Sequence, residues 1–369
     1  MGGVRKSMQE HQGTNQGIAQ SIYQSHSKKL QWQNLTLNIL GGQAILIAYI
    51  GLKAGLFQAI DQAYPSGIDE LSLAKKLGFA PRYVQVWCQA AYAFKLLELD
   101  EYGNYRLVPN MASLLLDTHD PLYMGSRIRF FASLYEDYQF FLQHLQSGGV
   151  VPRESSKSSL DIIYEMTRPD FKMITEMVLP QADKIVSRLD EHGGVILDIG
   201  VGVGCSLIHY ARRFPKAHIV GIDIDPSAVK QSQQAIAEAG LANQITVRQD
   251  DANLLKEECV YDLIIMNLVL HETGGSSSEY RNVLRRVRQA LKPGGVVVVC
   301  ELPYPDSVTE YRNKPLFQML AGLQIHEVLS GGGKITMGEL RNLLESTGFS
   351  NMRIADQPIP YRFVMMAEK

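Results

Sequence analysis

The stretch Val195-Ile-Leu-Asp-Ile-Gly-Val-Gly-Val-Gly204 decides the fold of this chain. It begins with a short apolar run that ends on Asp198, which is typical of a parallel strand buried on both faces. Gly200, Gly202 and Gly204 then occupy alternate positions. Glycine adopts backbone dihedrals that other residues resist, and its lack of a side chain lets the backbone approach a ligand. The stretch therefore predicts a strand that runs into a ligand-binding turn.

The charge beside this turn narrows the choice of ligand. A dinucleotide-binding turn follows the spacing G-x-G-x-x-G/A, but the sixth position here is Cys205. Asp198 stands just before the turn, where it would repel a pyrophosphate and attract an ammonium or sulfonium group. The turn therefore indicates S-adenosyl-L-methionine, which becomes S-adenosyl-L-homocysteine after methyl transfer, rather than NAD.

Further strand ends carry polar residues in the order that such a ligand needs. A strand over 218–223 ends on Asp223, nineteen residues after Gly204, where a carboxylate can accept both ribose hydroxyls. A strand over 245–248 leads to Asp251, whose carboxylate can accept a proton of the adenine amino group. The cofactor-binding residues predicted from these patterns are Asp198, Gly200, Gly202, Gly204, Asp223, Ile224, Asp251, Ala252 and Asn267.

Residues 184–369 resemble the class I S-adenosylmethionine-dependent methyltransferases. The resemblance rests on the glycine turn, Asp223, Asp251-Ala252, the segment Asn267 to His271 and Leu291-Lys-Pro-Gly-Gly295, in that order. It implies an α/β, Rossmann-like sheet that is mostly parallel with one antiparallel strand. The alternative is an ordinary doubly wound sheet whose glycines serve only tight turns. The remaining elements expected are strands over 261–267, 296–300, 352–356 and 361–366, and a helix over 336–346.

Residues 36–118 show the pattern of a mainly α, winged-helix-like domain. Helical periodicity predicts helices, and alternation around Gly103-Asn104 predicts a β-hairpin after them. From Gly41 to Asp117, six lysines and arginines stand against seven aspartates and glutamates, too few cations to engage DNA phosphates. We therefore expect a structural or dimerising module and no nucleic acid partner. The helices are expected over 44–60, 69–77 and 81–97, and the hairpin over 97–107.

This domain placed before the catalytic segment resembles the small-molecule O-methyltransferases of plants and bacteria. The resemblance implies a homodimer whose N-terminal domain pairs two subunits and helps to close the partner's pocket. It also implies that the helical connector over 119–183 lines the acceptor pocket, and this connector is rich in aromatic residues and methionine. Most of these side chains are expected in the core or at dimer contacts, and a minority around a flat acceptor. The substrate-binding candidates are Phe131, Tyr135, Met173 and Met177.

His271 follows the fourth strand, at the sheet edge where ligands collect. Methylation of oxygen must remove a proton from the acceptor, and a histidine with its usual pKa of about 6.5 is mostly neutral at pH 7 and can take that proton. In the O-methyltransferases the matching histidine is the base, and a glutamate matched here by Glu301 orients it. This chain departs from them because no Asp-Trp follows His271 and the second helper glutamate falls on Ile335. The alternative is a strand-end histidine that packs or caps, with Glu301 as an ordinary polar residue.

Length, charge and cysteine usage limit the number of domains, the classes of partner and the cellular location that we expect. The 369 residues suit two domains after a flexible arm over 1–35, and a net charge of -2 does not attract a polyanion. The four cysteines lack close pairing or metal-ligand spacing, which indicates free thiols in the cytoplasm. We expect no metal site, because the strand ends offer no close cluster of Asp and Asn. The apolar run Ala44 to Leu52 is too short to span a bilayer, so no membrane partner is expected.

These patterns predict a homodimeric methyltransferase that uses S-adenosylmethionine on a small, aromatic or polyketide-like molecule. Oxygen is the favoured acceptor atom, with His271 as base and Glu301 holding it. An enzyme that methylates carbon or nitrogen with the same donor is the first alternative, because it can dispense with a base at position 271. The alternative from another class is a cofactor-binding regulator that uses the winged helix on DNA.

Overall fold

The computed structural model describes residues 27–120, 122–150 and 157–369, and it divides the chain between Ala132 and Ser133. The first unit, Met1–Ala132, contains the predicted winged-helix-like segment, and the second, Ser133–Lys369, contains the glycine turn. Helix α7, Gly125–Gln143, crosses the division. Residues 1–26 of the predicted arm lie outside the described residues, whereas residues 28–35 are already helical.

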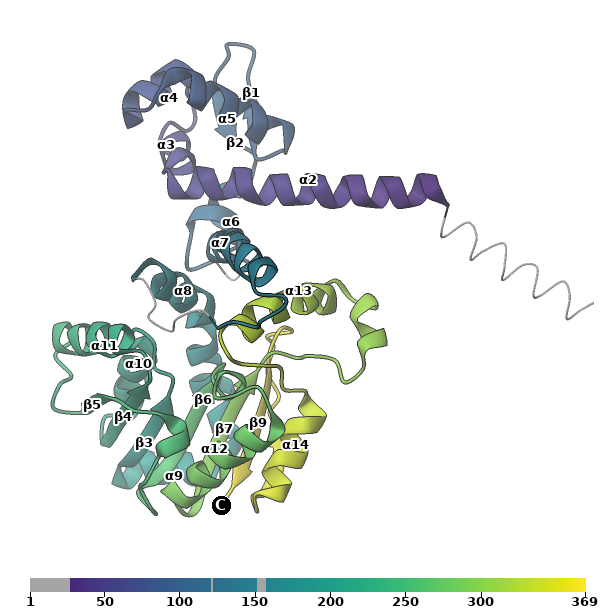
Figure 1. Cartoon of the computed structure of the whole chain (residues 1–369). Helices are drawn as coiled ribbons and strands as arrows, with labels where there is room; N and C mark the ends of the chain where they lie inside the picture. Colours follow the sequence, from purple (N-terminus) through teal and green to yellow (C-terminus); the bar gives the residue numbers. More distant parts are fainter. Residues whose placement is uncertain (1–26, 121, 151–156) are drawn as a thin grey trace, which may run out of the picture. The chain divides into compact units, whose positions relative to one another are not determined.

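The described part of the first unit consists of helices and one antiparallel hairpin (Figure 1). Asp69 caps α4 by accepting hydrogen bonds from the backbone N–H groups of Leu71 and Ser72, and Gly78 ends this helix with a φ of 70°. The single helix predicted over 44–60 is two helices, because Gly55, also at φ 70°, interrupts it. The elements are α2 Lys28–Lys53, α3 Leu56–Asp61, α4 Glu70–Leu77, α5 Pro81–Ala93, β1 Leu97–Leu99, β2 Tyr105–Leu107 and α6 Met111–Leu116.

Aromatic packing holds the C-terminal half of α2 against the rest of the first unit. Phe57 is fully buried and meets Trp87 edge to face, with ring centroids 5.3 Å apart. The Trp87 indole N–H donates to the carbonyl of Ile47 at 3.0 Å and so ties α5 to α2. A Cβ at Gly51 would collide with both rings, so the absence of a side chain permits this close approach. The N-terminal half of α2 remains mostly exposed.

Helix α2 is longer than the apolar run from Ala44 to Leu52 suggested. It has 26 residues, and its length and composition would suffice to cross a bilayer. Only 11% of its most apolar 18-residue segment is buried in the protein. The expectation that this segment is too short was therefore wrong. Length and composition do not separate a membrane span from a helix that packs on protein, and the absence of a membrane partner stays a prediction.

Helices also fill the connector between the winged-helix-like segment and the first strand of the catalytic sheet. Met173, at the end of α8, is 3% exposed and packs in the core together with Ile174 and Val178 of the next turn. The connector therefore contributes to the main core as well as to the protein surface. Its elements after α7 are α8 Lys157–Met173, η1 Ile174–Val178, η2 Leu179–Ala182 and α9 Asp183–His192.

A seven-stranded sheet with the strand order β5-β4-β3-β6-β7-β9-β8 forms the centre of the second unit (Figure 1). β9 runs antiparallel to both of its neighbours, and the pairs among β3 to β7 are parallel. The mostly parallel sheet with one antiparallel strand is the predicted topology, which is thus confirmed. The strands are β3 Gly194–Ile199, β4 Ala217–Asp223, β5 Ile245–Gln249, β6 Tyr261–Asn267, β7 Leu291–Glu301, β8 Ser350–Ile354 and β9 Phe363–Glu368.

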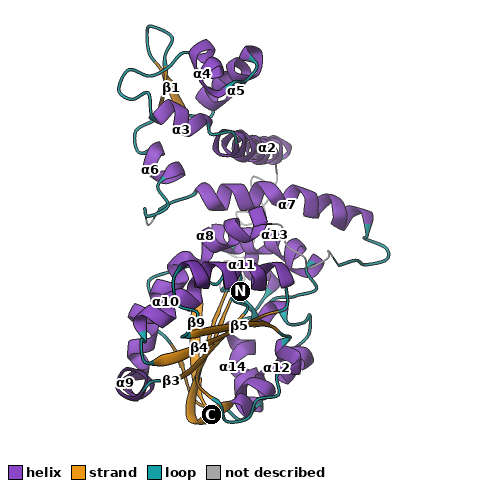
Figure 2. Ribbon diagram, turned by 90° about the vertical axis from the view of Figure 1, so that its left-hand side faces the viewer, coloured by secondary structure: helices purple, strands orange, loops and turns teal. Residues whose placement is uncertain are grey.

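Helices cover both faces of this sheet, with α9 and α10 on one side and α12 and α14 on the other (Figure 2). Two separate apolar cores result, and successive residues of β3 alternate between them: Ile196 faces one, while Leu197 and Ile199 face the other. The predicted start of the helix over 336–346 is confirmed, because Thr336 caps α14, and Asp225 caps α11 in the same way. The helices are α10 Cys205–Arg213, α11 Pro226–Glu238, α12 Ser277–Ala290, α13 Pro315–Leu329 and α14 Met337–Ser346, with short turns η3 Ala252–Leu254, η4 Leu270–Glu272 and η5 Val308–Arg312.

The strand order reverses next to β3. The chain passes from β3 to β4 and β5 on one side, and then returns to pair β6 with β3 on the other. At such a switch point the loops after the two adjacent strands diverge, and ligands of open α/β sheets bind in the crevice between them. The glycine turn follows β3 and the loop to His271 follows β6, so the topology places the predicted site residues at this edge.

Candidate active site

The glycine turn after β3 combines close packing with one open position. Gly200, Gly202 and Gly204 all have positive φ, at 76°, 52° and 80°. A Cβ at Gly200 would meet Val269 at 2.5 Å, and one at Gly204 would meet Ser232 at 2.9 Å. A Cβ at Gly202 would have nothing within 4 Å. Two of the glycines therefore let protein pack on protein, and Gly202 is the one whose open side suits a ligand.

Asp198 is a buried carboxyl at the base of this turn. It is 3% exposed and accepts a hydrogen bond of 2.6 Å from the Ser206 hydroxyl. Burial raises the pKa of Asp198 to about 7, and the nearby charge of Asp223 adds to the shift. No lysine or arginine pairs with Asp198 in the described part of the chain. A ligand that brought a positive charge would stabilise the ionised form, which fits a sulfonium or ammonium group.

Asp223 ends β4 next to the open glycine. Its two oxygens accept hydrogen bonds of 2.9 Å from the backbone N–H groups of Gly202 and Asp225, and each oxygen keeps a further lone pair. Burial raises the pKa of Asp223, and these backbone donors oppose the shift. The next residue, Ile224, is 43% exposed, so its apolar side chain is accessible for contact with a flat base. The carboxylate is thus held in place with capacity left for ribose hydroxyls.

Asp251 and Ala252 follow β5 beside the same edge. Asp251 caps the short turn η3 by accepting a hydrogen bond of 2.8 Å from the backbone N–H of Asn253. The Asn253 side chain also donates to the carbonyl of Thr273 at 3.1 Å, which links this loop to the one that carries His271. Ala252 is buried at 6% exposure. The backbone N–H of Asp250 donates to the Asp223 carbonyl at 3.0 Å, so the ends of β4 and β5 adjoin.

Asn267 ends β6 with an unsatisfied buried acceptor. Its Oδ1 has no hydrogen-bond partner within the described residues, although buried amide oxygens are normally paired. The following residue, Leu268, has a φ of 55°, a left-handed conformation that costs a residue with a side chain roughly 1–3 kcal/mol. An unpaired acceptor and a strained neighbour beside the glycine turn fit a site that is completed by an N–H donor of a ligand. Together with Asp198, the open Gly202 and Asp223, Asn267 suits S-adenosylmethionine.

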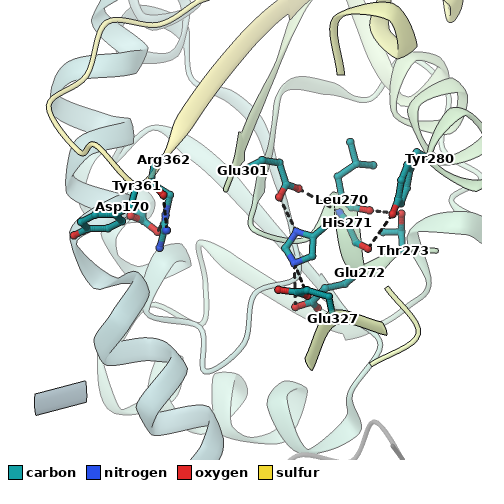
Figure 3. A network of polar contacts seen from close by, with 10 residues as sticks. All are labelled: Asp170, Leu270, His271, Glu272, Thr273, Tyr280, Glu301, Glu327, Tyr361 and Arg362. Atoms are coloured by element: carbon teal, nitrogen blue, oxygen red, sulfur yellow. Dashed lines mark hydrogen bonds and ion pairs between the residues drawn. The ribbon is translucent and has the colours of Figure 1, made fainter. Parts of the chain in front are cut away.

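His271 lies in η4, where it is buried at 4% exposure and surrounded by carboxylates (Figure 3). Its Nδ1 lies 2.6 Å from Glu301 Oε2, and Glu301 Oε1 accepts a hydrogen bond of 3.2 Å from the His271 backbone N–H. Its Nε2 lies 3.3 Å from Glu327 Oε2 and 3.9 Å from Glu272 Oε1. Glu301 is 2% exposed and sits at the end of β7. The structure thus brings together His271 and Glu301, as the sequence predicted.

The charge state of His271 differs from the expectation. Burial alone would lower the pKa of this imidazole, but the charges of Glu301 and Glu327 outweigh it and hold the pKa well above the usual value. The expectation that His271 keeps its usual pKa was therefore wrong. A carboxylate lies near each ring nitrogen, and these two contacts favour the protonated form of the ring.

Glu327 was missed from the sequence because it stands in a helix far from the strand ends. The position that corresponds to the second helper glutamate, Ile335, is 1% exposed in the apolar core, so it takes no part in the chemistry. Glu327 instead comes from α13, where it is 5% exposed. It is the only acidic residue in the 15-residue sequence of this apolar helix, and that isolated charge was the available signal.

The substrate-binding candidates of the connector are divided between the two units. Phe131 belongs to the first unit, and Tyr135, Met173 and Met177 belong to the second. Met173 packs in the core, while Tyr135 and Met177 are exposed at 61% and 44%. Their role in binding an acceptor stays a prediction.

Sequence relatives support the identification of the second unit as a methyltransferase domain. Residues 197–297 match the family model described as a methyltransferase domain. Over 82% of its length the chain is 24% identical to 3-hydroxy-5-methyl-1-naphthoate 3-O-methyltransferase of Streptomyces sahachiroi, and the match covers 85% of that protein. It is 31% identical to ribosomal RNA small subunit methyltransferase C of Pasteurella multocida, but over only 35% of this chain and 40% of that protein. The naphthoate methyltransferase matches both units of this chain, whereas the ribosomal RNA methyltransferase matches a shorter segment.

Solved structures share the fold of nearly the whole chain. Human N-acetylserotonin methyltransferase in complex with S-adenosylmethionine superimposes with a TM-score of 0.69 over 94% of this chain and 99% of that one, at 20% identity. A candidate O-methyltransferase from Nostoc punctiforme gives a TM-score of 0.72 over 94% and 100%, at 19% identity. At these identities the likeness concerns the fold, and the chemistry has to be argued from the site.

Proposed function

We propose that this chain, which belongs to the S-adenosylmethionine-dependent methyltransferases of class I, methylates an oxygen atom of a small aromatic or polyketide-like molecule. The observation that carries the proposal is the buried pair of His271 and Glu301 at the switch point of the sheet, with 2.6 Å between Nδ1 and Oε2. Methylation of a hydroxyl oxygen requires the removal of its proton. A buried histidine oriented by a carboxylate is suited to removing one.

Methyl transfer is an in-line displacement, so the protein must align the acceptor oxygen, the methyl carbon and the sulfur. Alignment of the reacting atoms supplies much of the rate. In the proposed mechanism Asp198 and Asn267 hold the charged amino acid end of the donor, and Asp223 holds its ribose. His271 takes the hydroxyl proton at Nε2, while Glu301 fixes the ring through Nδ1 and stabilises the imidazolium that forms.

Relatives that match both units support a small acceptor. The naphthoate enzyme and demethylspheroidene O-methyltransferase of Cereibacter sphaeroides act, by their names, on oxygen atoms of small molecules, and the latter matches 79% of this chain. The ribosomal RNA methyltransferases match little beyond a third of the chain. Both of these relatives match the two units together and are named for small acceptors, which favours that substrate class.

The decisive experiment identifies the product. Purified protein is incubated with methyl-labelled donor and an extract of the host cell, and the labelled compound is analysed for the atom that carries the methyl group. An O-methyl product supports the proposal, and an N- or C-methyl product refutes it. The variant His271→Asn should lower kcat about 100- to 10,000-fold with unchanged calorimetric affinity for the donor. His192→Asn, at a largely exposed histidine, is the matched control and should retain full turnover.

We also propose that the enzyme is a homodimer that associates through the first unit. Exposed apolar side chains lie along the first half of α2, and an apolar cavity of about 610 Å³ lies between the end of α2 and α5. Apolar patches of this kind mark association surfaces.

Cys88, Cys205, Cys259 and Cys300 are free thiols, which supports a cytoplasmic location.

A further inference from the structure

Lys334 stands beside the proposed base, His271, but has no role in the mechanism given above. It follows Gly333, whose backbone N–H donates to the His271 carbonyl at 2.9 Å. The Lys334 amine donates to the Tyr311 hydroxyl at 3.4 Å and lies 5.4 Å from the centre of that ring. It forms no ion pair with any carboxylate that the structure describes, and the side chain is half-buried. An ammonium group has three N–H donors, so two of them are left for a ligand.

The Tyr311 hydroxyl accepts two hydrogen bonds and keeps its own proton for a further partner. One donor is the Lys334 amine, and the other is the side-chain amide of Gln324 at 2.9 Å. Because a phenol carries one proton, Tyr311 still has an O–H group to donate. Gln324 stands three positions before Glu327 on α13, and residues at this spacing are neighbours on one helix face. The Tyr311 hydroxyl therefore lies near the face of α13 that carries Glu327 toward His271.

Tyr304 adds a third donor to this group. It is 5% exposed, and its hydroxyl has no hydrogen-bond partner within the described residues. Its backbone pairs with that of Thr336, two positions after Lys334. Burial raises the pKa of Tyr304, and the charges of Glu327 and Tyr311 add to the shift, so the phenol is protonated and lies near both side chains. Buried hydroxyls are normally paired, and an unpaired one beside the site fits a partner that arrives with a ligand.

We propose that Lys334, Tyr304 and Tyr311 bind a carboxylate of the acceptor and so hold the hydroxyl to be methylated beside His271. The inference rests on the proposed function and narrows its acceptor to a hydroxy acid. The three side chains offer N–H and O–H donors, and an ionised carboxylate accepts hydrogen bonds without donating any. Hydrogen bonds to a charged partner are roughly twice as strong as neutral ones. A single lysine balances one negative charge, which suits a carboxylate rather than a phosphate group.

The buried carboxylates of the site make this lysine necessary. Glu301 and Glu327 both contact the His271 ring, and neither forms an ion pair with Lys334. Their charges would repel an anionic acceptor at close range. The positive charge of Lys334 opposes that repulsion. An acceptor without a carboxylate gains nothing from this lysine, and the natural enzyme should therefore prefer the acid over an uncharged analogue.

The first test is the charge of the labelled product, which needs no variant. Product from the incubation of natural enzyme, methyl-labelled donor and host-cell extract is passed over an anion exchanger at pH 7 and then analysed. We expect a retained compound that carries a carboxylate besides its new O-methyl group. An O-methyl product without a carboxylate would overturn this inference and leave O-methylation standing. An N- or C-methyl product would refute O-methylation, so the two proposals fail separately.

The second test removes the charge of Lys334 and uses the acceptor identified from that product. Lys334→Met should raise KM for the acid about 10- to 100-fold and change kcat less than about threefold. Lys334→Arg keeps the charge and should stay within about fivefold of the natural KM. With the carboxamide of the same acceptor, the natural enzyme and Lys334→Met should give similar KM values. Lys184→Met, at an exposed lysine of α9, is the matched control, and an unchanged KM in folded Lys334→Met would overturn the inference.

The third test separates binding by Tyr304 from a merely structural role. Tyr304→Phe removes only a hydroxyl that has no partner within the described residues, so the melting temperature of the acceptor-free protein should not fall. The KM for the acid should nevertheless rise about tenfold, because a hydrogen bond to a charged group is lost. Calorimetric affinity for S-adenosylhomocysteine should stay unchanged. A KM equal to the natural one would remove Tyr304 from the carboxylate site.

Discussion

The two units of this protein place polar and apolar side chains in opposite ways. Among the described residues, the second unit buries eight side chains of Asp, Glu, His or Arg, whereas the first unit buries no side chain of Asp, Glu, His, Lys or Arg. Of the large apolar side chains that remain exposed in the described residues, 17 lie in the first unit and 13 in the second, although the second is much longer. These eight buried side chains are Asp170, Asp198, Asp225, Asp262, His271, Glu301, Glu327 and Arg362.

We infer from this difference that the second unit carries the chemistry and that the first unit carries the surface for association. Burial of an ionised group costs several kcal/mol unless it is paired, so a protein keeps one only for a reason. Asp262 and Asp170 pair with Lys292 and Arg362, which makes them structural. Asp198 and Glu327 have no lysine or arginine partner in the described residues, and both lie at the switch point of the sheet. Buried carboxylates without a lysine or arginine partner thus mark the proposed reaction site, and exposed apolar side chains mark the proposed surface for a partner.

The largest effect on stability should come from the core of the first unit. Phe57→Ala removes a fully buried ring that packs on Trp87 and should destabilise this unit by about 3–5 kcal/mol. Both tryptophans of the chain, Trp32 and Trp87, lie in this unit, so tryptophan fluorescence in urea reports its unfolding. Calorimetric affinity for the donor should stay unchanged. A loss of donor binding in step with the fluorescence would show that the units are not independent, and Tyr102→Ala, 79% exposed, is the control.

The next prediction tests how much the buried Asp198 carboxyl, which has no lysine or arginine partner in the described residues, lowers the free energy of unfolding. The pKa of Asp198 is raised to about 7, so its contribution to stability is complete below the unfolded value near 4 and is lost as the pH rises through 7. Asp198→Asn should therefore stabilise the protein without donor at pH 8, by at most about 4 kcal/mol, and weaken donor binding. Thermal melts at pH 4.5 and pH 8 measure the effect, with Asp61→Asn as an exposed control. If the variant kept the pH dependence of the natural protein, another group would be responsible.

A smaller effect tests the second acid of the donor site. Asp223→Asn keeps the shape of the side chain but replaces one acceptor oxygen by a donor. We expect a loss of about 1.5–3 kcal/mol in donor binding, which is roughly 10- to 100-fold in Kd. Titration calorimetry with S-adenosylmethionine and with S-adenosylhomocysteine measures it. Equal loss for both is expected, since they share the ribose, and unchanged affinity would remove Asp223 from the donor site.

The smallest effect on the fold should come from the exposed face of α2. Leu35 and Ile39 are 63% and 64% exposed and lie one helical turn apart. Replacing both by Gln should change the free energy of unfolding of the monomer by no more than about 0.5 kcal/mol, but it should abolish dimerisation. Light scattering after gel filtration gives the molecular mass. A natural protein that elutes as a monomer, or a variant that stays dimeric, would contradict the proposed interface, and Asn38→Gln is the control.

Structural features that depend on residues close by in the sequence were predictable. The strands follow from continuous apolar runs, and the helix ends at Asp69, Gly78 and Thr336 follow from side chains that satisfy backbone groups within a few positions. Asp223 and His271 could be placed because parallel strands all end at one edge of the sheet. The break of the first long helix at Gly55 escaped prediction, because a glycine inside an apolar periodic pattern does not announce whether it will end a helix.

The sequence by itself determined the class of fold, the glycine turn and the pair of His271 and Glu301, since each depends on neighbours along the chain or on a shared strand edge. Only the tertiary structure decided that Gly202 is the open glycine of the turn, that Glu327 lies near Nε2 of His271, and that the pKa of His271 is raised. The physical reason is distance along the chain. Glu327 stands 56 positions after His271, and its effect on the ring depends on a 3.3 Å contact in a buried, water-poor setting that no local pattern specifies.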